Sequence, residues 1–186
     1  MLGAVYINVE EQILIQKCKI GDEGAFREVF EHYYSPIYYF CLSYVRSRNE
    51  AEDLTQEVFI KAFKSIKSFG KGSFRAWLFK IARNHLIDEH RKHIRSITVS
   101  IDDVAEPAIE HTPESEIVAR SDMVELLKVI DGLAPEYREV MYLRFFQGLR
   151  YEEISEALGI PVGTVKTYIH RGRKEMLKRI NIETKQ

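Results

Sequence analysis

The densest group of side chains capable of chemistry lies between residues 85 and 93. His85, Glu89 and His93 recur at i, i+4 and i+8, the spacing that places three metal-binding groups on one face of a helix. The pattern differs from the H-E-x-x-H of zinc hydrolases, His85 adjoins an apolar stripe, and the neighbours Arg91 and Lys92 are basic. We therefore predict a structural histidine beside a basic surface, and no metal ion.

Other catalytic patterns are missing from the sequence. It contains no P-loop and no G-x-S-x-G elbow, and no pair of carboxylates can be argued to share a cleft. Cys18 and Cys41 form no C-x-x-C pair, so we predict buried thiols in a reducing compartment. No apolar run approaches the roughly 18 residues that cross a bilayer. We expect a cytoplasmic protein without membrane insertion, catalytic residues or cofactor.

The clearest pattern spans residues 151–177. Ile154, Ala157 and Leu158 form the apolar face of a short helix, and Gly159 supplies the permissive residue of a tight turn. Pro161 is tolerated only at a helix start. The segment therefore predicts a helix-turn-helix.

The second helix of this pair divides into an apolar and a cationic face. Val165, Ile169, Met176 and Leu177 are predicted to point inward, and residues 162–179 carry six Lys and Arg against one acid. Such a helix is typical of one that enters the major groove of DNA. The predicted DNA-facing residues are Gly163, Thr164, Lys166, Thr167, His170, Arg171 and Lys174.

Charge is distributed unevenly along the 186 residues, although the net charge is only -1. Residues 1–100 carry 15 Lys and Arg against 12 Asp and Glu, residues 101–136 carry 2 against 10, and residues 137–186 carry 10 against 6. An acidic middle segment thus hides two basic ends, which favours a nucleic-acid partner.

Helical periodicity dominates the elements around these motifs, and the predicted fold is all-α. The first part has helices at 9–20, at 25–33, from Pro36 to about 45, from an Asn49 cap to about 66, and from a Ser73 cap to about 95. Residues 96–113 lose periodicity and read as an acidic flexible linker. Four helices follow, at 114–133, 135–147, 151–158 and 161–179. We therefore predict two small helical domains joined by a tether.

The helix from Ser73 carries a mixed outer face. Lys80, Asn84, Ile87 and Arg91 recur at i, i+4, i+7 and i+11, and such a face suits exposed bases and their backbone. The preceding loop, residues 69–73, is long enough to wrap an extruded base. Trp77 is interpreted as a core residue rather than a base-stacking one.

Four segments in this order resemble the extracytoplasmic-function group of RNA polymerase sigma factors. They are GDEGAF (21–26), EAEDLTQEVFIKAF (50–63), FRAWLFKIARNHLIDEHRK (74–92) and YEEISEALGIPVGTVKTYIHRGR (151–173). The resemblance covers residues 10–180 and implies three parts. Residues 1–95 would be sigma region 2, residues 96–113 the linker, and residues 114–186 sigma region 4.

The resemblance also implies roles for individual residues. The second helix of the helix-turn-helix, the recognition helix, would read the minus-thirty-five element. Residues that would dock on the clamp helices of the largest subunit of core RNA polymerase are Asp53, Gln56, Glu57 and Ile60. Residues that would meet the melted minus-ten element are Phe69, Lys71, Ser73, Lys80, Ile81, Asn84, Ile87 and Arg91.

The implied partners are core RNA polymerase, promoter DNA in duplex and single-stranded form, and an anti-sigma factor. The linker would pass near the RNA exit channel. Tyr168 and His170 depart from common patterns of the family, which leaves the promoter sequence open. The alternative function is a self-standing helix-turn-helix regulator, which needs a sensing or dimerising N-terminal domain that the sequence does not indicate.

Overall fold

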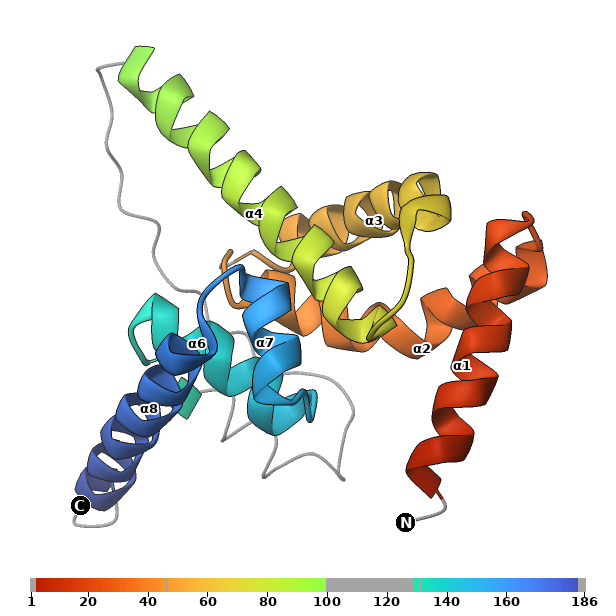
Figure 1. Ribbon diagram of the computed structural model, residues 1–186. Coiled ribbons are helices and arrows are strands. Elements are labelled where there is room, and N and C mark those ends of the chain that lie inside the picture. The colour runs from red at the N-terminus through yellow and green to blue at the C-terminus, as the bar shows by residue number, and fades with distance from the viewer. Residues whose placement is uncertain (1–2, 46, 100–128, 131, 184–186) are drawn as a thin grey trace. The chain divides into compact units, whose positions relative to one another are not determined.

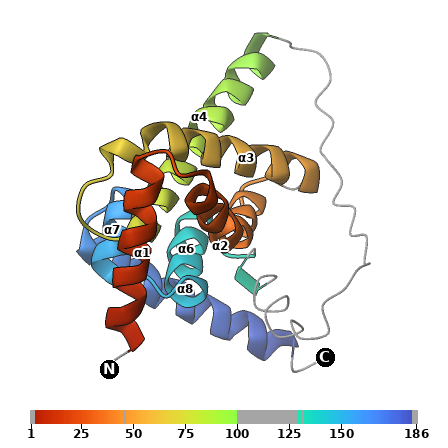
Figure 2. The same ribbon diagram turned by 90° about the vertical axis from the view of Figure 1, so that its right-hand side faces the viewer.

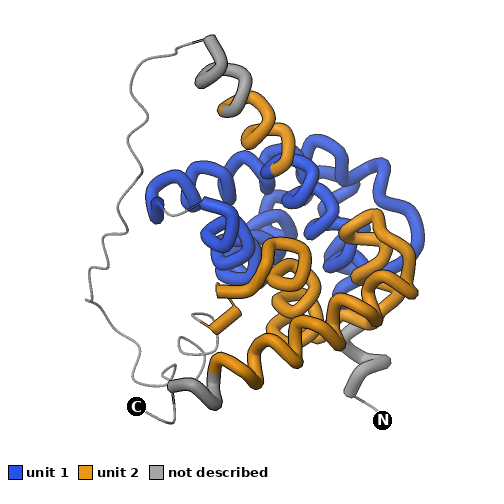
Figure 3. The backbone as a smooth tube through the Cα atoms, turned by 90° about the vertical axis from the view of Figure 1, so that its left-hand side faces the viewer, with its two compact units in different colours: residues 1–86 blue, residues 87–186 orange. Residues whose placement is uncertain are grey.

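The computed structural model describes residues 3–45, 47–99, 129–130 and 132–183. The described residues form helices and turns without a strand. The chain divides into two compact units, residues 1–86 and 87–186 (Figure 3). The division falls inside one long helix, so the domain boundary proposed after residue 95 stays a prediction.

The first unit is built from four helices, shown in Figure 1. They are α1 (Gly3–Lys19), α2 (Glu23–Leu42), α3 (Arg48–Ser65) and the beginning of α4 (Phe74–Val99), with a short 3-10 helix η1 (Ile66–Ser68) after α3. α2 packs along α3, and α1 lies beside α2 (Figure 2). The fully buried side chains at the centre are Ile15, Ile37, Phe40, Phe59, Phe74, Leu78 and Phe79.

Short polar side chains begin three of these helices. The Asp22 carboxylate accepts the Ala25 N–H at 2.8 Å, and Ser73 Oγ accepts the Ala76 N–H at 3.2 Å, as predicted for Ser73. The predicted cap Asn49 is wrong. Ser47 is the N-cap of α3, because its backbone is extended and its hydroxyl accepts the Glu50 N–H, which places Asn49 inside the first turn.

The prediction that Pro36 starts a separate helix is wrong, because Pro36 lies inside α2. A proline within a helix costs about 3 kcal/mol. Ile37, Phe40 and Cys41 follow it at helical spacing and are completely buried. Burial of each large apolar side chain contributes about 1.5–3 kcal/mol, so the packing outweighs the proline and keeps the helix continuous.

α4 runs to Val99, and residues 96–99 are therefore helical rather than part of the predicted linker. The sequence from Ile87 to Val99 contains neither glycine nor proline to end the helix. The rest of the predicted linker, residues 100–113, and the predicted helix over 114–128 lie outside the described residues.

The second unit contains the helix-turn-helix. Its described helices are α6 (Pro135–Met141), the π-helix η2 (Tyr142–Phe146), α7 (Tyr151–Leu158) and α8 (Val162–Glu183). Ile130, Leu133 and Met141 form a buried cluster with Tyr137, Phe146 and Met176 packed against it. Residues 129–130 are helical and residues 132–133 form a turn, so the helix predicted to reach Leu133 ends earlier. The helix predicted over 135–147 ends as a π-helix.

The turn between α7 and α8 depends on Gly159. Its backbone is left-handed, with φ 62° and ψ 33°, as the C-cap of α7. Ser155 Oγ donates to the Ile160 carbonyl at 2.5 Å, and the Ile160 N–H donates to the Ser155 carbonyl at 3.2 Å. These bonds close the turn and determine where α8 begins.

We predict that Gly159→Ala lowers the free energy of unfolding of the second unit by about 1 kcal/mol. The added methyl group meets no atom within 4 Å, so the cost arises from the left-handed backbone alone. Gly163→Ala is the matched control, because Gly163 is helical and its added methyl group also meets open space. Urea denaturation followed by circular dichroism measures both changes. The single tryptophan, Trp77, reports the first unit and should keep its midpoint.

Candidate functional site

The recognition helix α8 presents the predicted face to solvent. Val165 and Ile169 are buried, which orients the helix. Leu177, predicted to point inward, is 60% exposed, whereas its neighbour Met176 packs on the buried cluster; the two side chains lie about 100° apart around the helix. Six of the seven predicted residues are exposed and Thr164 is half-buried; the exposed ones are Gly163, Lys166, Thr167, His170, Arg171 and Lys174.

The positive charges in the first part of α8 are free of neighbouring acidic residues in the same segment. Residues 162–174 include no acid, and the first carboxylate, Glu175, bonds Arg179 at 3.2 Å. The Thr167 hydroxyl donates to the Gly163 carbonyl at 3.0 Å, which fixes its rotamer and turns its acceptor lone pairs outward. Tyr168 is half-buried and packs edge-on against Tyr137, with ring centroids 5.4 Å apart, so it supports the helix rather than its outer face. The first three turns of α8 therefore form a cationic, hydrogen-bonding surface.

A second group of predicted residues lies on α4 and on the loop before it. Lys71, Lys80, Asn84 and Arg91 are exposed. Phe69, Ser73, Ile81 and Ile87 are half-buried. The Ser73 hydroxyl accepts the helix-cap bond, which leaves its O–H donor and one lone pair for a ligand.

The loop over residues 69–73 is held by aromatic packing and by α1. Phe69 contacts Phe74 and Trp77, with centroid separations of 5.4 and 5.3 Å. Lys19 Nζ donates to the Phe69 carbonyl at 2.5 Å and also lies 5.6 Å from the centre of its ring. Trp77 is half-buried within this cluster, where it supports the loop.

The third group occupies one face of α3. Its four residues, Asp53, Gln56, Glu57 and Ile60, are all exposed, and Ile60 keeps 51% of its surface accessible. The opposite face of the helix is buried, as predicted, through Ala51, Leu54, Val58 and Ala62. An exposed isoleucine one helical turn after Glu57 and two turns after Asp53 forms a surface that suits a partner with apolar and basic groups.

One buried polar side chain supports this face from behind. His85 on α4 is 2% exposed, its Nε2 lies 2.8 Å from Glu57 Oε2, and its Nδ1 lies 2.6 Å from Lys61 Nζ. An ammonium group only donates, so Nδ1 accepts and the ring proton resides on Nε2, at ion-pair distance from the Glu57 carboxylate but outside hydrogen-bond geometry. Glu89 lies close by, because ligand atoms of Glu57, His85 and Glu89 fall within 4.8 Å of one another. The assignment of His85 as a structural histidine without a metal ion therefore stays a prediction.

Sequence reasoning missed Lys61 and Lys19. Lys61 follows Glu57 by one helical turn, a spacing that indicates a surface ion pair, but not the buried imidazole between them. Lys19 ends α1 and carries no pattern that links it to Phe69 fifty residues later. Both contacts are tertiary and become visible only in the structure.

Comparisons with known proteins agree with this arrangement. Residues 29–96 match the family model for sigma-70 region 2, and residues 123–176 match that for sigma-70 region 4. The chain is 35% identical to the ECF RNA polymerase sigma factor SigW of Bacillus subtilis over 89% of its length and 94% of the relative. It is 32% identical to the ECF RNA polymerase sigma-E factor of Haemophilus influenzae, over 91% and 95% of the two chains.

A solved structure shares the fold. The sigma factor RpoE of Bartonella quintana, crystallised with the anti-sigma factor NepR, superposes with a TM-score of 0.68 at 26% identity, covering 84% of this chain and 97% of the other. The chain belongs to the sigma-70 family, in its extracytoplasmic-function group. It is a transcription initiation factor that directs RNA polymerase to promoters, and sigma factors are not themselves catalysts. Among the described residues, no helix is both long and apolar enough to cross a membrane.

Both cysteines should resist alkylation in the native protein. Burial raises the pKa of the Cys18 thiol and of the Cys41 thiol to about 11. Compared with an ordinary thiol of pKa about 9, the reactive thiolate at pH 8 is then about a hundredfold less populated. We expect slow labelling by iodoacetamide that accelerates up to about pH 11, and rapid labelling of both cysteines in urea. Rapid labelling of either thiol at pH 8 without denaturant would contradict the burial.

Proposed function

We propose that this chain reads promoters at two places while bound to core RNA polymerase through α3. The observation that carries the proposal is the cationic outer face of α8, held in place by the buried Val165 and Ile169 behind it. Phosphate neutralisation by this face gives affinity, and its side chains near the N-terminal half of the helix read base edges of the minus-thirty-five element.

The proposed minus-ten surface combines the loop over residues 69–73 with the outer face of α4. Unpaired bases need a cationic path and flat or apolar contacts, which Lys80, Asn84 and Ile81 offer together. Base pairing is broken in the melted promoter, so a surface of this kind captures the strand only after opening. The two DNA surfaces therefore act at different stages of initiation.

The proposed polymerase surface is the outer face of α3. Its carboxylates, Asp53 and Glu57, attract the basic groups of a partner, and Ile60 supplies apolar contact area at the same face. We further propose that the protein works in the cytoplasm, needs no cofactor and is held inactive by an anti-sigma factor. Support for the last point comes from the similar RpoE structure, in which a sigma factor is bound by NepR.

The DNA surface on α8 is tested by removing one cation. A promoter is first selected from genomic fragments by the wild-type holoenzyme. Arg171→Ala should then weaken holoenzyme binding to the selected minus-thirty-five sequence by about 5- to 150-fold, equivalent to 1–3 kcal/mol, and bind a scrambled sequence almost as before. Lys178→Ala is the matched control, because it removes the same charge further along α8. Equal losses on both sequences from Arg171→Ala would show a phosphate contact without base reading.

The polymerase surface is tested by charge reversal on α3. Asp53→Lys and Glu57→Lys should each weaken binding to core RNA polymerase by about tenfold or more, because they place a cation against a basic partner. Glu52→Lys makes the same change on the same helix but on another face, where Glu52 approaches Tyr34 and contributes to the raised pKa of that phenol. It should leave the affinity nearly unchanged. Fluorescence anisotropy of labelled protein measures all three.

His85 should matter to the polymerase through Glu57 alone. His85→Ala is expected to weaken polymerase binding severalfold, because Glu57 loses the buried group that orients its carboxylate. In a Glu57→Ala background the same change should have no further effect on binding, whereas a general loss of fold would weaken binding in both backgrounds. Circular dichroism confirms that each variant remains helical.

A further inference from the structure

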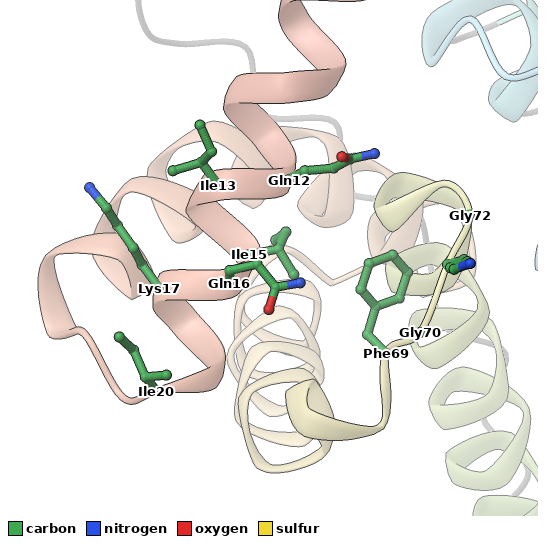
Figure 4. Close-up of a pocket in the computed structure, with 10 residues that line it drawn as sticks. Gln12, Ile13, Ile15, Gln16, Lys17, Ile20, Phe69, Gly70 and Gly72 are labelled. Atoms are coloured by element: carbon green, nitrogen blue, oxygen red, sulfur yellow. The ribbon is translucent and has the colours of Figure 1, made fainter.

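A pocket of about 770 Å³ separates α1 from the loop before α4. Figure 4 shows α1 on one side and the loop over residues 69–72 on the other. This volume falls within the range of ordinary ligand pockets. The lining residues that matter for its chemistry are Gln12, Gln16, Lys17, Phe69, Gly70 and Lys71.

α1 contributes two amides to this pocket. Gln12 and Gln16 are one helical turn apart, so they lie on the same face of α1, and both side chains extend toward the loop (Figure 4). Both residues are exposed, and the buried Ile15 anchors the helix between them. Each amide offers two N–H donors and one carbonyl acceptor. Because both side chains are exposed, neither has to bond to the protein.

The loop forms the opposite wall. Gly70 and Gly72 carry no side chain, so backbone and the Phe69 ring border the space from this side. Lys19 joins the two walls through its bond to the Phe69 carbonyl at 2.5 Å. α1 is also attached to the core, because Tyr33, buried in α2, donates to the Glu11 carboxylate. The separation between the walls is therefore determined by contacts outside the pocket.

The chemistry of the lining indicates the ligand. The lining has no acidic residue and includes Lys71 of the loop, which favours an anion; its other lysine, Lys17, extends from α1 away from Phe69 (Figure 4). The glutamine amides and the Phe69 ring bind the edge and face of a planar polar group. A nucleotide has all three features, with a phosphate, a polar base edge and an aromatic face. The loop is also the part of the proposed minus-ten surface that would receive an extruded base.

We propose that this pocket takes one unpaired base of the nontemplate strand, and that Gln12 and Gln16 of α1 read its polar edge. The inference rests on the proposed function and extends it, because it adds α1 to a surface otherwise made by the loop and α4. The two glutamines are specificity-determining residues, and promoter choice at one position should depend on them.

The test uses holoenzyme and forked promoter DNA that carries a single abasic site, moved through each position of the nontemplate strand. With wild-type protein, one position should lose at least fivefold in affinity when its base is removed. The double variant Gln12→Ala/Gln16→Ala should bind intact DNA more weakly than wild type and should show a smaller loss at that abasic position, because only the contact with the Phe69 ring is left to lose. Sensitivity at other positions should remain.

Glu10→Ala is the matched control, since Glu10 is exposed on α1 and does not line the pocket. It should reproduce the wild-type abasic profile. An unchanged profile for the glutamine variant would overturn the inference. The proposed minus-ten function itself would fail in a different way, with no abasic-sensitive position even in wild type.

A protein segment is the competing occupant, because Ile13 and Ile20 also line the pocket and are 54% and 85% exposed. Figure 4 places both isoleucines on the side of α1 away from Phe69. If a segment of the polymerase occupied the pocket, Ile20→Ser and the glutamine variant would weaken polymerase binding without DNA. That result, with an unchanged abasic profile, would also overturn the inference.

Discussion

Burial of one face of each binding helix is the constraint on which the rest of the structure depends. In α3 the buried residues are Leu54 and Val58, and in α8 they are Val165 and Ile169. Rotation of either helix about its axis would expose these side chains and bury charged ones, at a cost of several kcal/mol. The apolar stripe therefore determines which side chains face solvent. The proposed affinities for polymerase and DNA would thus depend on residues that contact neither partner.

His85 extends this constraint to a polar contact. In α4 it follows Lys80 and Asn84, which are proposed to meet DNA, and precedes Leu86 of the core. Its ring contacts Glu57 of α3. A buried imidazole is stable only while its two nitrogens keep partners, so α3 and α4 cannot shift independently without loss of these contacts. The surfaces of the first unit that are proposed to face polymerase and DNA consequently share one support.

Sequence reasoning was successful where periodicity decides the outcome. The buried and exposed faces of α3 and α8 follow from a repeat of 3.6 residues, and Gly159 follows from the need for a left-handed turn. It was wrong at Asn49, because the nearby Ser47 is the cap instead. It was also wrong at Pro36, because tertiary packing outweighs the local preference of proline. The π-helix after Met141 had no signal in the sequence. The Lys19 contact to Phe69 had none either, because its partners are fifty residues apart in the chain.

The charge distribution explains why two DNA-reading surfaces can exist on a protein of net charge -1. Phosphate contacts provide affinity for any DNA, and their strength grows with the number of cations on a surface. Residues 162–179 carry six cations, but residues 101–136 carry ten acids and lower the attraction of the whole chain for nucleic acid. We therefore expect each proposed surface alone to bind arbitrary DNA weakly. Binding would become effective when polymerase presents both surfaces to one promoter, because the second contact then forms at a high local concentration.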